Sequence, residues 1–280
     1  MFKLLCKLPF IGSRLKKRNR VHVIRMSGVI AAPENSSRRS NTINLNDYKS
    51  LIDQAFDHPA VNAVYIILNS PGGSPVQSDL IGEYLLTKKK EHNIPITVFV
   101  EDVAASGGYW IACAADEIYA RPASIVGSIG VVSAGFGLNE LIKRYGIERR
   151  VYTSGTQKAF MDPFQKEQEK DVKRLKDLQT NIHDIFIKWV KQQRGDKLKG
   201  TKKTLFDGQF WLAQDALDKG LIDGIDTLDK KAKEVYGDNV KLRYFEPERG
   251  FISSLFKMKL EPSFKSLEND LAWSKFNMKA

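Results

Sequence analysis

Ser106 is the strongest candidate for a nucleophile in this 280-residue chain. It lies in Ala104-Ala105-Ser106-Gly107-Gly108, directly after an apolar run and before a helical pattern. Small neighbours let a substrate carbonyl approach a hydroxyl to about 3–3.5 Å, and a helix N-terminus favours developing negative charge. The alternative is that Ser106 only caps the helix that begins near Tyr109, as serines at such positions often do.

The base that would activate this serine is more plausibly a lysine than a histidine. None of the four histidines lies in a turn of small residues: His22, His58, His92 and His183. A lysine can replace histidine as a base where burial keeps its amine neutral. Lys158, in TSGTQKAFM (153–161), has small and apolar neighbours, whereas most other lysines stand in charged clusters. Taken alone, the segment favours an exposed loop lysine at position 158.

A second small-residue turn, Ser70-Pro71-Gly72-Gly73, follows the apolar run Val61–Leu68. It has neither the spacing of a phosphate loop nor that of a dinucleotide-binding fingerprint. Paired glycines can expose backbone N–H groups, which would stabilise the oxyanion of an acyl-transfer intermediate. A tight strand-to-helix turn without a catalytic role is the alternative.

The elements that must position these residues alternate between strands and helices. Continuous apolar runs at 61–68 and 95–100 predict strands buried on both faces. Further strands are predicted at 21–26, 117–120, 128–133 and 149–152, and helices after Asn46, at 138–145 and over about 163–194. This alternation predicts a mainly parallel α/β fold, with both small-residue turns at the carboxyl ends of strands.

Five segments occur in a characteristic order: NSPGGS (69–74), AASGGYW (104–110), VGSIGV (126–131), SGTQKAF (154–160) and GQFWLAQDALDKGLID (208–223). Over roughly residues 21–230 the chain resembles the signal peptide peptidase A family of Ser-Lys serine peptidases, in its short, single-repeat form. The resemblance implies a ClpP/crotonase-like fold built of repeated ββα units.

The resemblance also implies a role for each site residue. Ser106 would be the nucleophile and Lys158 the general base, within one protomer or between neighbours. Gly73 would supply an oxyanion N–H, with Gly107 as a second donor. Ser128 would hydrogen-bond the Lys158 amine and orient it without adding a charge; an ordinary turn serine is the alternative.

By the same resemblance, the chain would need no metal or organic cofactor and would form homo-oligomers. Its substrates would be hydrophobic peptides, such as remnants of signal peptides, or unfolded segments. Two other functions stay open. The fold could serve a crotonase-like enzyme that processes acyl-CoA thioesters without a serine nucleophile, or a non-catalytic membrane scaffold.

Charge and the chain ends bear on location. The formal net charge is +11, yet no helix-turn-helix, zinc-finger or RNP-like pattern is present, so nucleic acid is not an expected partner. Residues 1–20 are apolar and then basic, too short for a membrane span but suited to the surface of an anionic membrane. We expect peripheral attachment on the cytoplasmic side, a peptidase domain over 21–245, and an amphipathic or weakly ordered tail over 246–280. The alternative for residues 1–20 is a basic tail.

Overall fold

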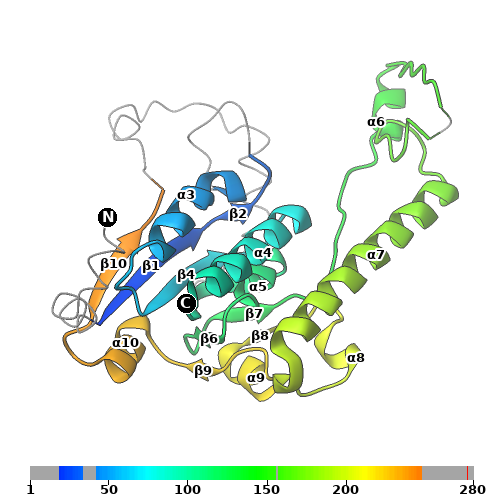
Figure 1. Ribbon diagram of the computed structural model, residues 1–280. Coiled ribbons are helices and arrows are strands. Elements are labelled where there is room, and N and C mark those ends of the chain that lie inside the picture. Colours follow the sequence, from blue (N-terminus) through cyan, green and yellow to red (C-terminus); the bar gives the residue numbers. More distant parts are fainter. Residues whose placement is uncertain (1–18, 34–41, 156, 248–275, 277–280) are drawn as a thin grey trace.

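A computed structural model describes residues 19–33, 42–155, 157–247 and 276 (Figure 1). Within these residues an eight-stranded sheet runs in the order β10-β1-β4-β5-β6-β9, and every neighbouring pair in that order is parallel. The remaining two strands continue from the end of β5, which pairs with β7, and β7 pairs antiparallel with β8. The bounds are β1 Arg20–Ser27, β4 Ala63–Ser70, β5 Ile96–Ala105, β6 Glu117–Ala120, β7 Ile125–Gly127, β8 Phe210–Leu212, β9 Gly224–Ile225 and β10 Lys241–Phe245.

Helices cover both faces of this sheet. The larger core lies between the sheet and the helices α3 (Leu45–Phe56), α4 (Pro75–His92), α5 (Gly107–Ala112) and α7 (Glu169–Arg194). On the opposite face, Tyr65, Phe99 and Tyr119 pack with Ala232 of α10 (Leu228–Tyr236). Because β4 and β5 are buried on both faces, their sequences are continuous Val, Ile and Leu runs, as parallel central strands require.

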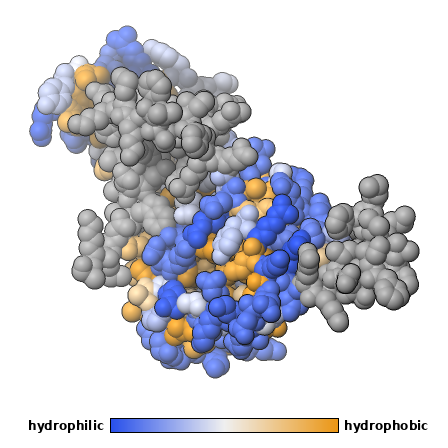
Figure 2. Space-filling view, turned by 90° about the vertical axis from the view of Figure 1, so that its left-hand side faces the viewer, coloured by the Kyte–Doolittle hydropathy of each residue, from blue (hydrophilic) through white to orange (hydrophobic). Residues whose placement is uncertain are grey.

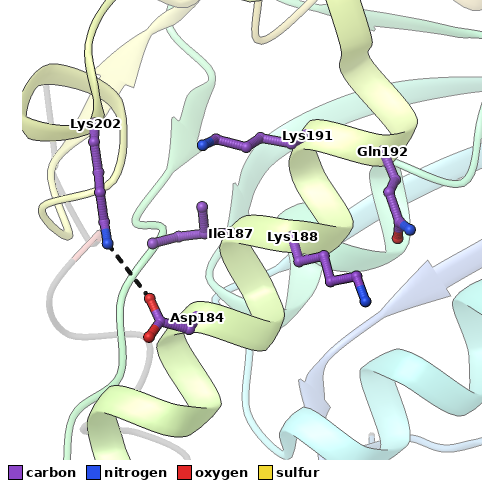
Figure 3. A pocket seen from close by; sticks show the side chains of 6 residues that line it. All are labelled: Asp184, Ile187, Lys188, Lys191, Gln192 and Lys202. Atoms are coloured by element: carbon purple, nitrogen blue, oxygen red, sulfur yellow. Dashed lines mark hydrogen bonds and ion pairs between the residues drawn. The ribbon is translucent and has the colours of Figure 1, made fainter.

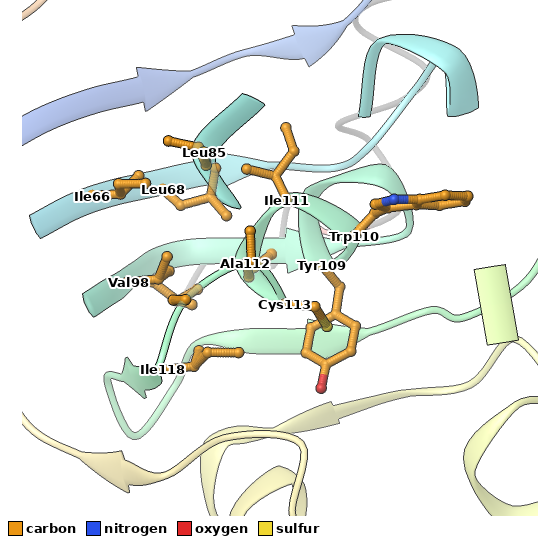
Figure 4. Packing of buried hydrophobic residues seen from close by; sticks show 14 of the residues in the cluster. Ile66, Leu68, Leu85, Val98, Tyr109, Trp110, Ile111, Ala112, Cys113 and Ile118 are labelled. Carbon is orange, nitrogen blue, oxygen red and sulfur yellow. The ribbon is translucent and has the colours of Figure 1, made fainter. Parts of the chain in front are cut away.

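The short helix α5 directly follows Ser106, and all of its residues are buried. Figure 4 shows Tyr109, Trp110 and Ile111 among aliphatic side chains of β4, α4 and β5. The Trp110 ring stacks on Phe186 of α7 with 4.7 Å between ring centroids, and the Trp189 indole donates to the Trp110 carbonyl at 2.9 Å. The C-terminal half of α7 therefore fixes α5 in the core.

Between β7 and α7 the chain leaves the body as an arm, residues 131–168, that contains α6 (Asn139–Arg144) (Figure 1). None of the α6 residues is buried. Figure 2 shows apolar residues among polar ones on the part of the molecule that projects above the body. Large apolar side chains on the arm are highly exposed, among them Phe136 (80%) and Tyr152 (90%).

The structure confirms the predicted alternation of strands and helices and corrects several of its details. Residues 128–133 and 149–152 form no strand. The first predicted strand is displaced to β7, and the second segment lies in the arm, where no strand among the described residues pairs with it. The long helix begins at Glu169 rather than near 163. Asn44, not Asn46, caps α3, by accepting a hydrogen bond from the Asp47 amide.

The described residues include no helix with the length and apolar character needed to cross a bilayer. The predicted interfacial segment and most of the predicted tail lie outside the described residues, so both stay predictions.

Candidate active site

Ser106 occupies the junction between β5 and α5. Its backbone has φ 52° and ψ −122°, a conformation that costs a non-glycine residue roughly 1–3 kcal/mol and is often found at functional sites. The Ser106 amide donates to the Gly127 carbonyl at 2.8 Å, and its carbonyl accepts from the Trp110 amide at 3.0 Å. Its hydroxyl forms no capping hydrogen bond with α5. The half-buried side chain is therefore not a helix cap and is available for chemistry.

The glycine turn after β4 packs directly against this junction. A Cβ on Gly72 would lie 2.7 Å from Ser106 Cβ and 2.8 Å from the Ala105 carbonyl oxygen, and Gly72 has φ +103°. A Cβ on Gly107 would lie 2.4 Å from Ser78 Oγ. Gly72 needs glycine because its φ is positive and its turn lies against the Ser106 backbone, whereas at Gly107 a side chain would meet Ser78 of α4.

This close approach brings two amide groups together beside Ser106. Gly73 pairs with Ile30 in an isolated parallel bridge that uses the Gly72 carbonyl and the Ser74 amide, so the Gly73 N–H points away from Ile30. Gly107 is the first residue of α5, where an amide has no partner within its helix. The position of a Gly107 Cβ would be only 3.4 Å from the Gly73 nitrogen. Two N–H donors beside one hydroxyl is the arrangement that an oxyanion site requires.

Ser128 lies next to the same junction. Ala105 pairs with Gly127, the last residue of β7, and Ser128 then leaves the strand with φ 52°. Its amide donates to the Gln209 carbonyl at 2.7 Å, and its side chain is half-buried. The structure thus brings Ser106, Ser128 and both glycines together from three segments that follow β4, β5 and β7.

Lys158 lies elsewhere, in the arm, and is exposed. Its amide donates to the Gly155 carbonyl at 3.3 Å, and nearby Phe160 lies under the Arg174 guanidinium of α7 at 5.9 Å. Arg174 precedes Phe186, the residue that stacks beside α5, by twelve positions, which is about 18 Å along a helix. One chain therefore does not bring its own Lys158 to its own Ser106 in this conformation.

The four histidines do not supply an alternative base at the junction. His22 is fully buried on β1, between β10 and β4; its Nδ1 donates to the Ala55 carbonyl at 2.7 Å, and its imidazole is close to His58. His92 stacks near Phe56. His183 comes nearest, with its Nε2 bonded to the Ile129 carbonyl at 3.0 Å. Because Nε2 is already hydrogen-bonded to a backbone oxygen, His183 does not present it to Ser106 as a base.

Sequence reasoning missed two residues that shape the site. Ile30, in the two-residue strand β2 (Val29–Ile30), holds the glycine turn, but so short a strand has no periodicity to predict it. Asn69 fixes the irregular end of β5: its side chain donates to Asp102 at 2.6 Å and accepts from the Val103 amide at 3.2 Å. The signal in the sequence that could have identified Asn69 is its position as the first residue of the NSPGGS segment.

A surface hollow of about 410 Å³ between α7 and α8 (Lys202–Leu205) shares no residue with this junction. Figure 3 shows Lys188, Lys191 and Lys202 around it, with Lys202 paired to Asp184 at 3.4 Å. Exposed lysines that already have a carboxylate nearby do not define a binding site.

Comparison with known proteins decides the family. A model of peptidase family S49 matches residues 88–242, more than half of the chain. The chain belongs to peptidase family S49. This S49 chain is 31% identical to a protein named signal peptide peptidase SppA from Enterococcus faecium, over 82% of its own length and 68% of the relative's. It is 30% identical to a protein named protease SohB from Buchnera aphidicola subsp. Baizongia pistaciae, over 90% and 70% of the two lengths.

Higher identity is found to a much longer protein. A protein of Brucella abortus (strain 2308) named Na(+)/H(+) antiporter NhaA is 48% identical over 83% of the S49 chain, which spans only 31% of that relative. The shared part is less than a third of the relative, so the relative's name says nothing about transport by this chain.

Solved structures establish the fold. Two mutant forms of the membrane-bound stomatin-specific protease 1510-N, one in complex with a substrate peptide, superpose with TM-scores of 0.50. The form without a peptide is 18% identical to this S49 chain, and the match covers 82% of this chain and 99% of the other. The form with the substrate peptide is 17% identical, and the match covers 91% of this chain and 98% of the other. The predicted ClpP-like α/β fold is confirmed.

Proposed function

We propose that this S49 peptidase is a serine endopeptidase whose nucleophile is Ser106 and whose general base is Lys158 of a neighbouring copy. The Lys158 amine takes the Ser106 proton as Oγ attacks the scissile carbonyl carbon. The Gly73 and Gly107 amides stabilise the oxyanion that forms. Lys158 then protonates the leaving amine, and water attacks the acyl-enzyme to release the second product.

One observation carries the proposal. Ser106 is held in an unfavourable backbone conformation, its hydroxyl is not used as a helix cap, and two amide donors lie beside it. A turn selected for stability alone would place a glycine at φ 52° and would not need the close contact with Gly72.

The position of the arm supports a lysine supplied by a neighbouring copy. Lys158 is exposed in a single chain, and the arm presents several uncovered apolar side chains, including Phe136, Tyr145 and Tyr152. Soluble proteins seldom leave such a set uncovered, and contact with a second copy would bury it. A neighbour's arm laid over the Ser106 junction would bury Lys158 beside Ser128, whose hydroxyl would orient the amine.

Hydrophobic peptides, such as signal peptide remnants or unfolded segments, are the proposed substrates. The name of the Enterococcus faecium relative supports this class, and so does an apolar sheet face that begins one residue before Ser106. Peripheral attachment through residues 1–20, on the cytoplasmic side of a membrane, would bring the enzyme close to such peptides.

Hydrolysis of casein and of a hydrophobic fluorogenic peptide tests the proposal. Ser106→Ala and Lys158→Ala should each lower kcat by a factor of about 10³ or more. Ser133→Ala and Lys166→Ala change the same residue types at exposed positions of the arm and should retain the wild-type rate. A Ser106→Ala chain that hydrolyses peptides at the rate of these controls would remove the proposal.

A further inference from the structure

The glycine turn between β4 and α4 has few backbone N–H groups, and most of them already have an acceptor. Pro71 has no N–H at all. The Gly72 amide donates to the Ser70 hydroxyl at 3.2 Å. The Ser74 amide donates to a carbonyl of β2 at 2.8 Å. Gly73 is exposed, and among the described residues its amide has no acceptor. The Gly73 N–H is therefore the donor that this turn leaves available to a bound peptide.

Ser70 contacts both of the elements that carry the two oxyanion donors. It is the last residue of β4 and is fully buried. Its hydroxyl holds the Gly72 amide, one residue before Gly73. Its carbonyl faces the first turn of α5, where a Cβ on Gly108 would lie 2.7 Å from the Ser70 oxygen. Ser70 also pairs with Ala104, just after the point at which the register between β4 and β5 shifts. One buried residue therefore lies between the glycine turn and the start of the helix.

The hydroxyl matters because a buried amide without an acceptor is unfavourable. Gly72 is buried and has φ +103°, in a region that side chains disfavour and glycine enters freely. With an alanine at position 70 the Gly72 N–H would lose its acceptor, and the glycine backbone would rotate to find another. Gly73 comes next in the chain, so its N–H would turn with this rotation and no longer point to the Ser106 junction.

We propose that Ser70 is a positioning residue for the oxyanion site. Its hydroxyl fixes the Gly72 peptide, so that the Gly73 N–H is aimed at the oxyanion that forms when Ser106 attacks. The proposal rests on the peptidase function proposed above and adds a determinant of its rate. A donor that acts on the oxyanion stabilises the transition state more than the bound substrate, so a misdirected donor lowers kcat and leaves KM unchanged. Because Ser70 is fully buried, it acts only through the turn.

Ser124 provides a matched control. It is 1% exposed, and its hydroxyl also accepts a backbone amide, that of Arg121, at 2.9 Å. This bond lies in the turn between β6 and β7, before β7 reaches the junction. The Ser124 hydroxyl also donates to the Val100 carbonyl at 3.3 Å, so Ser124→Ala should lower the melting temperature at least as much as Ser70→Ala. Only the change at Ser70 should lower kcat.

The test combines hydrolysis of a hydrophobic fluorogenic peptide with inhibition by a peptide boronate. The tetrahedral adduct of the boronate with Ser106 places an oxygen where the oxyanion forms. Ser70→Ala should lower kcat about 10- to 100-fold, less than the loss of about 10²–10³ expected when a donor is removed outright. KM should stay within twofold of wild type, and boronate affinity should fall by the same factor as kcat. Equal kcat and equal boronate affinity in Ser70→Ala and Ser124→Ala would overturn the proposal.

A second variant separates the hydrogen bond from simple filling of space. Ser70→Cys keeps a side chain of similar shape but offers a much weaker acceptor, and it replaces the alanine variant if that chain does not fold. Its kcat and its boronate affinity should each be about threefold or more below wild type. A wild-type kcat in Ser70→Cys would show that the side chain acts only by its volume and would contradict a positioning hydrogen bond.

The same assays separate this inference from the function on which it rests. If the wild-type chain hydrolyses peptide, Ser106→Ala does not, and Ser70→Ala matches its control, the positioning role is wrong and the peptidase stands. If wild type and Ser106→Ala hydrolyse peptide at the same rate, the peptidase proposal is wrong, and a positioning role toward Ser106 is overturned with it.

Discussion

The Ser106 junction and the arm that carries Lys158 differ in almost every physical respect. The junction is enclosed: Ala105 and Tyr109 are fully buried, and three glycines let backbone segments approach within van der Waals distance. The arm is open: Tyr152 is 90% exposed, and a Cβ on Gly135 or Gly137 would meet nothing within 4 Å.

This difference suggests how the catalytic work is divided. Oxyanion donors act best when they are fixed before the reaction begins, which a packed core provides. A general base that is assembled from another copy needs a surface that can be covered, which an open arm provides. The junction should therefore respond to substitutions as a core does, and the arm as an interface does.

The largest expected contrast is in stability. Phe186→Ala removes a buried ring that stacks on Trp110 behind the junction, and the free energy of unfolding should fall by about 3–5 kcal/mol. Tyr152→Ala in the arm should change it by less than about 0.5 kcal/mol. Urea denaturation of the two variants at low protein concentration measures both values. Equal losses would show that the arm is packed in the free chain.

Acid should weaken the body through its buried histidine. Burial lowers the pKa of His22 to about 4, and the Arg20 and Arg243 charges and neighbouring His58 act in the same direction. The unfolded chain takes up this proton near pH 6.5, whereas the folded chain resists it. The stabilising contribution is present above pH 6.5 and is lost between pH 6.5 and 4, by about 3 kcal/mol.

The measurement is the free energy of unfolding from pH 7.5 to 4.5 for wild type and His22→Phe. The slope should become markedly shallower in His22→Phe. Part of the slope should persist without His22, because burial and the same arginines also lower the pKa of His58. Identical slopes in the two chains would contradict the assignment.

A smaller contrast comes from one methyl group. Gly72→Ala would place a Cβ against Ser106 and the Ala105 carbonyl at φ +103°, so we expect a stability loss of about 1–3 kcal/mol and a loss of kcat. Gly135→Ala in the arm meets no atom and should be neutral or slightly stabilising. Thermal unfolding and peptide hydrolysis compare them. A fully active Gly72→Ala chain would show that the junction tolerates displacement.

Sequence patterns predicted the parts of this molecule that depend on local burial. The apolar runs at 61–68 and 95–100 became β4 and β5, because strands buried on both faces need apolar residues throughout. The small residues around Ser106 were predicted to let a substrate carbonyl approach the hydroxyl, and in the structure they also allow the close approach of the Gly72 turn. Ser128 and Gly73 reached the same junction by following their strands to the same edge of the sheet.

Other features have no local signal. Residues 149–152 have the composition of a strand, but in the described part of the chain no strand lies beside them, so they stay irregular. Strand β2 is two residues long and pairs with an equally short strand further along the chain, β3 (Thr42–Ile43), and Ile30 also bridges to Gly73. In the proposed assembly, the place of Lys158 depends on the copy that covers the arm, and the segment that contains the lysine carries no signal of that contact.

Subunit complementation tests the central claim most directly. Ser106→Ala and Lys158→Ala chains are each purified, mixed in equal amounts under conditions that allow subunits to exchange, and assayed with a hydrophobic fluorogenic peptide. If each site takes its serine and its lysine from different copies, the mixture should recover about one quarter of the wild-type rate. A mixture as inactive as its two components, in a preparation in which subunit exchange is demonstrated, would contradict a lysine supplied by a neighbour.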